Sequence, residues 1–416
     1  MEKKKNDFIA QGSILAVASI LVRVMGMIYR IPMTAIIGDK GNGFYSYAYS
    51  VYTILLLLSS YSLPLAVSKM VSAKAQLGQW RNVKRVFICA IAFAIGIGTT
   101  FGLIVLIGAQ FFTRVFFHSE LAAIALRFMA PTILIMALLG VFRGFFQGLQ
   151  NTLPTAVSQI VEGLINAIMS VVFAYFLFDF GHGMDAASGT TDLGYAWGAA
   201  GGAIGTGAGA LAGLIFCFIL FVAYRKILAV NISRDKTGTQ QEYGDIFRLM
   251  LSIALPVILS TALYNLIELV DGSLFNNIMA SKGMEDVKDS MWGAYNAKAL
   301  LLVHIPVSIS SAMAVSLVPT LTAAYALGDE QTAKSKVHAI LRFISILAFP
   351  SAVGLLVLAN PIIKTLFSGD TSAASTYLQV VCPAVITFSF STITNSILQG
   401  IDRMNLPVCH SLIAMA

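Results

Sequence analysis

Two arginines within the first apolar stretch of the chain have the spacing and chemistry of an anion site. Arg23 and Arg30 are seven residues apart, which places them on one face of an α-helix with Gly26 between them. Guanidinium groups bind phosphate through paired hydrogen bonds, so this face suits a phosphate-bearing ligand. The alternative is that Arg23 pairs with a carboxylate while Arg30 extends to the membrane interface.

Carboxylates also recur at helical spacing within apolar stretches. Asn265, Glu268 and Asp271 are three residues apart on one predicted helix, and Glu162 belongs to a similar polar stripe on another. Two carboxylates this close repel each other in lipid unless one is protonated or a cation lies nearby. They could therefore couple transport to Na+ or H+, or form fixed ion pairs with Arg23 or Lys298. Lys298 itself, at the start of a later helix, could bind a ligand or lie at the interface.

The composition requires lipid as the solvent for this chain. Hydrophobic residues make up 57% and charged residues only 11%, and the mean hydropathy is +0.80. Soluble domains carry roughly a quarter charged residues. The cysteines form no CxxC pair and the histidines lack ligand spacing, so we predict no metal and no cofactor.

Basic residues predict the orientation of the chain in the membrane. Lysines and arginines concentrate in Lys3–Lys5 and in every second loop after it, which places the N-terminus in the cytoplasm. The first apolar segment runs past any plausible cleavage point, so we expect it to remain as a span. The pI near 9.2 then reflects topology and gives no reason to expect nucleic acid as a partner.

Apolar runs of about 20 residues predict ten spans. We place them near residues 8–32, 43–69, 86–111, 121–147, 154–178, 196–224, 247–279, 292–325, 338–363 and 372–400. An eleventh begins at Pro407 and covers half a span, which would leave backbone carbonyls unsatisfied in lipid. We therefore expect residues 1–224 to form a six-helix bundle, 225–246 a cytoplasmic linker, and 247–416 a second bundle that is incomplete at its C-terminus.

The two predicted bundles carry traces of an internal repeat. Residues 102–148 align with 354–400 without a gap, so that Pro131 matches Pro383 and both stretches end in Gln-Gly. Duplicated helix bundles are typical of transporters, with the substrate site between the halves. The sequence thus predicts an all-α polytopic membrane protein with two pseudo-symmetric six-helix bundles.

A row of glycines predicts one close helix contact. Gly201, Gly205, Gly209 and Gly213 recur every four residues and give one smooth helix face. Such faces allow close packing in membranes. A nucleotide-binding loop is the weaker interpretation, because no strand precedes it.

Several short motifs resemble those of one transporter superfamily. Residues 23–30 (RVMGMIYR), 295–298 (YNAK), 317–321 (LVPTL) and 349–353 (FPSAV) resemble MurJ-type lipid II flippases, while 62–69 (SLPLAVSK) is similar to the SpoVB/YtgP branch. Both branches belong to the MOP superfamily, which also contains the MATE exporters. The resemblance implies fourteen helices in two lobes around a cationic cavity. It also implies diphosphate-binding roles for Arg23, Arg30 and Lys298. Residues 43–68 lack the arginine usual in the peptidoglycan branch, so other polyprenyl-diphosphate sugars remain open.

These observations favour a flippase over an enzyme. The expected substrate is a polyprenyl-diphosphate-linked cell-wall precursor, with lipid II first, moved from the inner to the outer leaflet by alternating access. The membrane potential, Na+ or H+ could drive the cycle. A flippase for another lipid-linked repeat unit and a cation-coupled MATE-type drug exporter are the alternatives. A membrane enzyme is disfavoured because the outer loops are short and contain no DxD. The oligomeric state stays open.

Overall fold

The computed structural model describes residues 17–60, 62–238, 240–326, 328–369 and 371–401, with single residues at 403, 406, 409 and 413. The regular elements in these ranges are helices, which confirms the predicted all-α polytopic fold class. The first helix is Val17–Ile28. It is followed by α2 (Arg30–Ser60), α3 (Leu63–Gln76), α4 (Trp80–Phe117), α5 (Ala122–Gly148), α6 (Leu153–Ser188), α7 (Leu193–Ser233), α8 (Tyr243–Ser281), α9 (Glu285–Ala294), the π-helix η1 (Tyr295–Leu300), α10 (Leu301–Ala326), α11 (Glu330–Val357), α12 (Ala359–Leu366), α13 (Ser372–Val381) and α14 (Ala384–Gly400).

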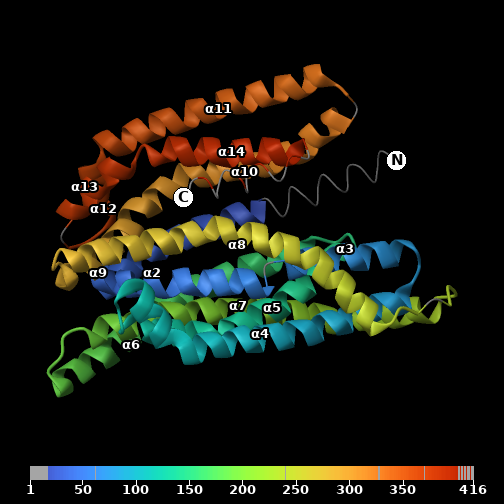
Figure 1. Ribbon diagram of the computed structural model, residues 1–416, viewed down its shortest axis with the longest axis horizontal. Coiled ribbons are helices and arrows are strands. Elements are labelled where there is room, and N and C mark those ends of the chain that lie inside the picture. The colour runs from blue at the N-terminus through green and yellow to red at the C-terminus, as the bar shows by residue number, and fades with distance from the viewer. Residues whose placement is uncertain are drawn as a thin grey trace.

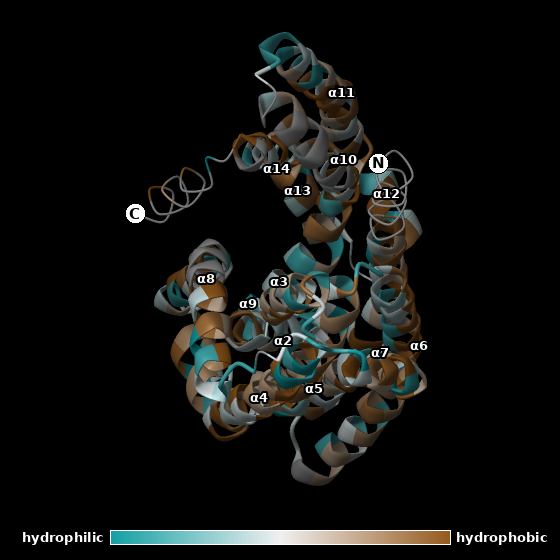
Figure 2. Cartoon of the chain, turned by 90° about the vertical axis from the view of Figure 1, so that its right-hand side faces the viewer, coloured by the Kyte–Doolittle hydropathy of each residue, from teal (hydrophilic) through white to brown (hydrophobic). Residues whose placement is uncertain are grey.

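The helices run back and forth between two ends of the molecule (Figure 1). We call one the α9 end, where α9, α12 and α13 lie, and the other the linker end, where residues 234–242 join α7 to α8. Six described helices are long and apolar enough to cross a membrane, or seven if the bent pair α13–α14 is one crossing. Figure 2 shows apolar residues along α6 and α11, and Ile107 on α4 is 79% exposed. The chain is a multi-pass membrane protein.

The first reversal of the chain lies at Gly38, inside α2. Gly38 has φ 62° and ψ −175°, a left-handed backbone that glycine adopts at little cost. The first pass therefore ends at Ile37 and the second begins at Asp39, whereas the sequence analysis left residues 33–42 outside both spans. The charged Asp39 and Lys40 are helical because each has an ion-pair partner on another element.

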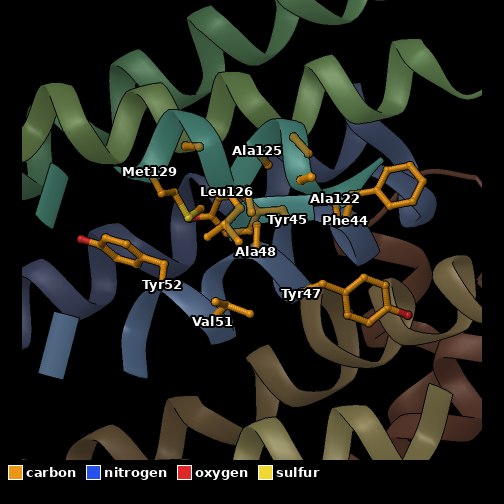
Figure 3. Packing of buried hydrophobic residues seen from close by; sticks show 14 of the residues in the cluster. Phe44, Tyr45, Tyr47, Ala48, Val51, Tyr52, Ala122, Ala125, Leu126 and Met129 are labelled. Atoms are coloured by element: carbon orange, nitrogen blue, oxygen red, sulfur yellow. The ribbon is translucent and has the colours of Figure 1, made fainter. Parts of the chain in front are cut away.

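Buried side chains join the helices of the first half around α2 and α5. Tyr45 and Tyr52 of α2 lie beside Leu126 and Met129 of α5 in one cluster (Figure 3). Tyr47 is fully buried on a different face of α2 and stacks on Phe117, with ring centroids 4.7 Å apart. The ring of Trp292 in α9 lies 6.2 Å from that of Tyr47, so the cluster reaches the second half of the chain.

The apolar contacts place α8 against the first six passes. Ile246 and Met250 of α8 are buried with Val83 and Phe87 of α4, whereas α10, α11, α13 and α14 share a separate cluster. The polar stretch between the bundles is shorter than the predicted linker, because α7 continues to Ser233 and α8 begins at Tyr243.

The linker is tied to the start of α4. The Asp235 carboxylate accepts hydrogen bonds from the Arg81 backbone N–H at 2.9 Å and from both the N–H and the hydroxyl of Thr237. These bonds hold the pKa of Asp235 at about 2. Arg85 donates to the Gln241 carbonyl and lies over the Tyr243 ring at 5.2 Å, so the segment has a fixed course.

The glycine row on α7 faces α6, the helix with which α7 packs along most of its length. A Cβ at Gly209 would come within 2.6 Å of the Glu162 carbonyl, and at Gly201 and Gly205 it would meet backbone atoms of α6 even more closely. Gly213 is less crowded, with its nearest neighbours at 3.4 Å. Three of the four glycines therefore lie where a side chain would separate the two helices.

Gly205→Ala should destabilise the protein by about 1–3 kcal/mol, because the methyl group must push α6 away from α7. The matched control is Gly96→Ala on α4, where a Cβ meets nothing within 4 Å. Relief of glycine entropy should leave that variant unchanged or about 0.5–1 kcal/mol more stable. Thermal unfolding in one detergent compares them, and equal melting temperatures would contradict close packing at Gly205.

Asp235→Asn should loosen the linker, since a neutral amide is a weaker acceptor for the Arg81 and Thr237 donors. Hydrogen–deuterium exchange at neutral pH should be faster in peptides that contain Arg81 and Thr237, while α5 peptides serve as the control. In the wild type the depressed pKa means that this tie is fully present above about pH 4 and is lost as the pH falls toward 2. Unchanged exchange in the variant would show that the tie does not hold the linker.

Candidate functional site

A cavity of about 540 Å³ lies between the first helix, α6 and α10. It brings together side chains from both halves of the chain. A transporter built from an internal repeat is expected to have its substrate site in such a place. Its described polar lining consists of Arg23, Tyr29, Arg30, Tyr49, Asn166, His304, Ser308 and Ser311.

Arg23 and Arg30 supply the charge of this cavity. Both line it together with Gly26, so the predicted shared helix face is the face that the cavity uses. Arg23 is exposed and Arg30 is half-buried. Among the residues that the structure describes, no carboxylate forms an ion pair with either arginine. The cavity is therefore an electropositive site suited to an anion.

The wall opposite the arginines carries polar groups that the sequence analysis did not select. His304, Ser308 and Ser311 project from α10 into the cavity at spacings of four and three residues. The His304 ring stacks on Phe388 with centroids 6.1 Å apart, which fixes its plane. The sequence signal that could have identified these residues is their helical spacing, which gives one polar stripe on an apolar helix.

Glu162 is held by an arginine from a neighbouring helix. Arg143 Nη2 lies 2.6 Å from Glu162 Oε2, and Arg143 Nε donates to Ser158 Oγ at 2.8 Å. Charge pairing is thus what Glu162 does in this structure. The sequence analysis did not predict this pair, since nothing in the sequence places the end of α5 beside α6.

Lys298 lies outside the cavity lining, in η1. Its side chain is 3% exposed, and its Nζ lies 2.7 Å from Asp39 Oδ1 and 2.9 Å from Oδ2. The ion pair joins the second half of the chain to the reversal at Gly38. In this conformation Lys298 is therefore neutralised by Asp39 and does not join Arg23 and Arg30 in the cavity lining.

Asn265 and Asp271, the two described side chains of the polar stripe on α8, are not in this cavity lining. Asn265 is half-buried and Asp271 is exposed, while the Glu268 side chain lies outside the described part of the chain. No cluster of histidine, cysteine and acidic residues in the described part could hold a metal ion. Ion coupling at these residues stays a prediction.

The α9 end is held by close backbone contact and buried charge. A Cβ on Gly43 or Gly293 would strike the backbone of the other segment, so α2 and α9 touch there. Lys288 is 3% exposed and donates to the carbonyls of Phe117 and His118, at 2.7 and 2.8 Å. These are terminal carbonyls of α4, where the helix dipole favours a cation.

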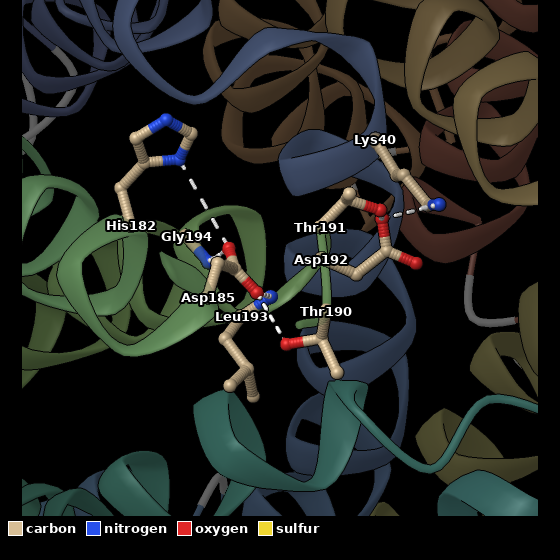
Figure 4. Close-up of polar contacts among 8 residues, drawn as sticks. All are labelled: Lys40, His182, Asp185, Thr190, Thr191, Asp192, Leu193 and Gly194. Atoms are coloured by element: carbon tan, nitrogen blue, oxygen red, sulfur yellow. Dashed lines mark hydrogen bonds and ion pairs between the residues drawn. The ribbon is translucent and has the colours of Figure 1, made fainter. Parts of the chain in front are cut away.

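A second set of polar contacts ties α6 and α7 to the same end (Figure 4). Asp185 of α6 accepts from the N–H groups of Leu193 and Gly194, at 3.0 and 2.9 Å, and so caps the first turn of α7. Lys40 lies 2.7 Å from Asp192, which joins the Gly38 reversal to that turn. At the α9 end, α2 is thus tied both to α9 and to the start of α7.

Family comparisons cover most of the chain. The family described as polysaccharide biosynthesis protein matches residues 8–324, and a second family of the same description matches residues 285–375. Two relatives come from Bacillus subtilis (strain 168). Lipid II flippase MurJ is 26% identical over 97% of this chain and 74% of its own length. Stage V sporulation protein B is 23% identical over 98% of this chain and 76% of its own. These matches confirm the resemblance drawn from the motifs.

Solved structures of MOP transporters share the fold. An inward-facing multidrug resistance MATE family transporter of the MOP superfamily superposes with a TM-score of 0.73, at 14% identity, over 96% of this chain and 88% of that one. An outward-facing conformation of such a transporter gives 0.61, at 15% identity, over 97% and 85%. At this identity the likeness shows the fold alone.

Replacing Lys298 with Met should destabilise the protein by about 3–5 kcal/mol, because Asp39 then keeps a part-buried charge without its partner. The double variant Asp39→Asn/Lys298→Met should recover part of that loss. The control is Glu330→Gln, which breaks an exposed pair with Lys334 (80% and 72% exposed) and should change stability by less than about 1 kcal/mol. Thermal unfolding compares them, and equal effects of the two single substitutions would contradict the role of the buried pair.

Proposed function

Because this chain belongs to the polysaccharide biosynthesis protein family, we propose that it is a flippase for a polyprenyl-diphosphate-linked saccharide in the bacterial cytoplasmic membrane. The observation that carries the proposal is the cavity between the halves, in which two arginines have no carboxylate partner among the described residues. The MurJ and SpoVB relatives support a transporter rather than an enzyme. Lipid II is the substrate that we put first, and another lipid-linked repeat unit is the alternative.

The two arginines match the part of such a lipid that does not vary. A diphosphate carries two negative charges and several acceptor oxygens in a short length, and each guanidinium can bind it bidentately. Arg23 and Arg30 lie about two helical turns apart, close to 10 Å along the axis, so each can contact a different side of the diphosphate. Asn166, Ser308 and Ser311 then offer neutral hydrogen-bonding groups to the first sugar.

The arrangement of contacts supports alternating access in which this conformation is closed at the α9 end and takes up its substrate from the side of the N-terminus. Contacts between α2 and α9 hold the halves together at the α9 end, and the superposition favours the inward-facing transporter, at 0.73 against 0.61. With the N-terminus in the cytoplasm, this conformation would receive the lipid from the inner leaflet. Release outside would then require the Lys298–Asp39 pair to break. Lys298, once free, would add a third cation to the diphosphate, which is how its predicted binding role fits this geometry.

The membrane potential supplies a driving force that needs no further site. Moving two negative charges outward across a cytoplasm-negative potential of 100 mV is favourable and releases about 4–5 kcal/mol. The positively charged empty cavity is drawn back inward by the same field. Coupling to Na+ or H+ would rest on Glu268 and Asp271, because Glu162 is already paired with Arg143.

Replacing Arg23 with Ala should lower affinity for a polyprenyl-diphosphate disaccharide about tenfold to a hundredfold, since each charge-assisted hydrogen bond contributes about 1.5–3 kcal/mol. Arg30→Ala should act in the same direction. Arg114→Ala is the matched control, because Arg114 lies at the α9 end, 72% exposed beside Glu120. Native mass spectrometry measures binding, and a fluorescence-quenching assay in proteoliposomes measures flipping.

The substrate panel separates the candidate functions. Binding of lipid II above other polyprenyl-diphosphate sugars would support the peptidoglycan precursor, and equal binding of all of them would support a general repeat-unit flippase. Normal flipping by Arg23→Ala would rule out the diphosphate clamp. Binding of cationic drugs without any binding of diphosphate lipids would replace the proposal with drug export.

A further inference from the structure

A second hollow lies between the same two helices as the cavity, nearer the linker end. It has a volume of about 360 Å³, and all of its lining residues are apolar, including Val17 and Leu21 of the first helix and Leu153, Ala156 and Ile160 of α6. Val17, Leu21 and Leu153 are 56%, 48% and 52% exposed, so the hollow opens on the outer surface of the helices. In a membrane protein that surface faces lipid tails.

The groove and the arginine cavity follow one another along one pair of helices. Arg23 follows Leu21 by two residues, about 3 Å along the helix axis. Gly163, which lines the cavity, follows Ile160 on α6 by about one turn. At Gly163 the two helices meet, because a Cβ there would lie 2.9 Å from Met25 Cε. An apolar groove and a cationic cavity therefore occupy successive turns of the same helix pair.

We propose that this groove binds the first isoprene units of the polyprenyl tail while Arg23 and Arg30 hold the diphosphate. The inference rests on the proposed function and adds a site for the other end of the ligand. An isoprenoid chain has no polar atom, so it enters an all-apolar groove without losing hydrogen bonds. Because the tail leaves lipid and not water, the gain comes from close van der Waals contact with the groove.

The location of the groove agrees with loading from the inner leaflet. It lies at the linker end of α6, the end that the charge pattern places in the cytoplasm. A headgroup that moves toward the α9 end would leave its tail beside Leu153 and Val17, within the bilayer. The tail site would recognise every polyprenyl-diphosphate lipid alike, and leave discrimination between headgroups to the cavity.

The test compares two ligands that differ only in tail length. One is a long-chain polyprenyl-diphosphate disaccharide, and the other is a short analogue that ends in a methyl diphosphate ester and so has no isoprene unit to place in the groove. Leu21→Trp and Leu153→Trp each fill the groove from an exposed position, so folding should be retained. Both should weaken binding of the long-chain ligand by about tenfold or more and leave the short analogue unchanged. Ile107→Trp, on the lipid-facing side of α4 and 79% exposed, should change neither.

A photoreactive diazirine on the first isoprene units supplies a direct readout. Cross-links should concentrate in residues 17–21 and 153–160, and unlabelled long-chain ligand should suppress them. Cross-links spread along α4 near Ile107, unchanged long-chain affinity in both tryptophan variants, or equal loss of both ligands would overturn the tail site. Suppression by phosphatidylglycerol as efficient as by the long-chain ligand would also overturn it, because the groove would then be a general phospholipid site.

The Arg23→Ala arm separates this inference from the function on which it rests. Loss of both ligands in that variant, with no effect of the groove variants, leaves the flippase standing and removes the tail site. Failure of the wild type to bind either ligand removes both.

Discussion

Charge placed in apolar surroundings must be neutralised within the molecule, and this constraint explains much of the arrangement. A buried ion without a partner costs several kcal/mol. Arg143 is accordingly paired with Glu162 across two helices, Lys298 with Asp39 across the two halves, and Lys288 with the terminal carbonyls of α4. Among the described side chains, Arg23 and Arg30 lack such a carboxylate. The remaining way to neutralise them is with water or with an anionic ligand, and that is why the cavity marks the site.

Apart from the packing of α8 on α4, the contacts between the halves lie mainly at one end of the molecule. The close approach of Gly43 and Gly293, the Lys298–Asp39 pair and the stacking of Tyr47 near Trp292 all lie at the α9 end. The long helices α10, α11 and α14 pack mainly on one another. Polar and glycine-based contacts at this end accompany the aromatic contacts of Tyr47, Phe117 and Trp292. The glycine row between α6 and α7, by contrast, holds two helices of the first half in close contact.

The sequence analysis succeeded where local pattern decides and failed where distant pairing decides. Hydropathy predicts the helices and their order, and helical spacing places Arg23 and Arg30 on the face that lines the cavity. The position of the first reversal was harder to predict, because the charged residues Asp39 and Lys40 suggest a loop unless their ion-pair partners are known. The same holds for Lys298, a cation beside an aromatic motif, whose carboxylate lies 259 residues away.

The neutral wall of the cavity shows a different limit. His304, Ser308 and Ser311 have ordinary helical spacing, but an apolar helix with a few polar residues is common in membrane bundles. The stripe can be recognised as part of a site only when α10 is known to lie opposite the first helix. Position in space, which depends on the packing of the two halves, is information that a single sequence does not contain.

The π-helical turn η1 sets the phase between two parts of one helix. A π-helical turn contains one more residue than an α-helical turn, so α9 and α10 are offset by about 100° from the register of a continuous α-helix. Lys298 within the turn meets Asp39, while His304 beyond it faces the cavity. Removal of one residue from this turn would rotate one set of side chains relative to the other. The extra residue is thus the geometric device that lets a single helix serve the contact between the halves and the ligand cavity at the same time.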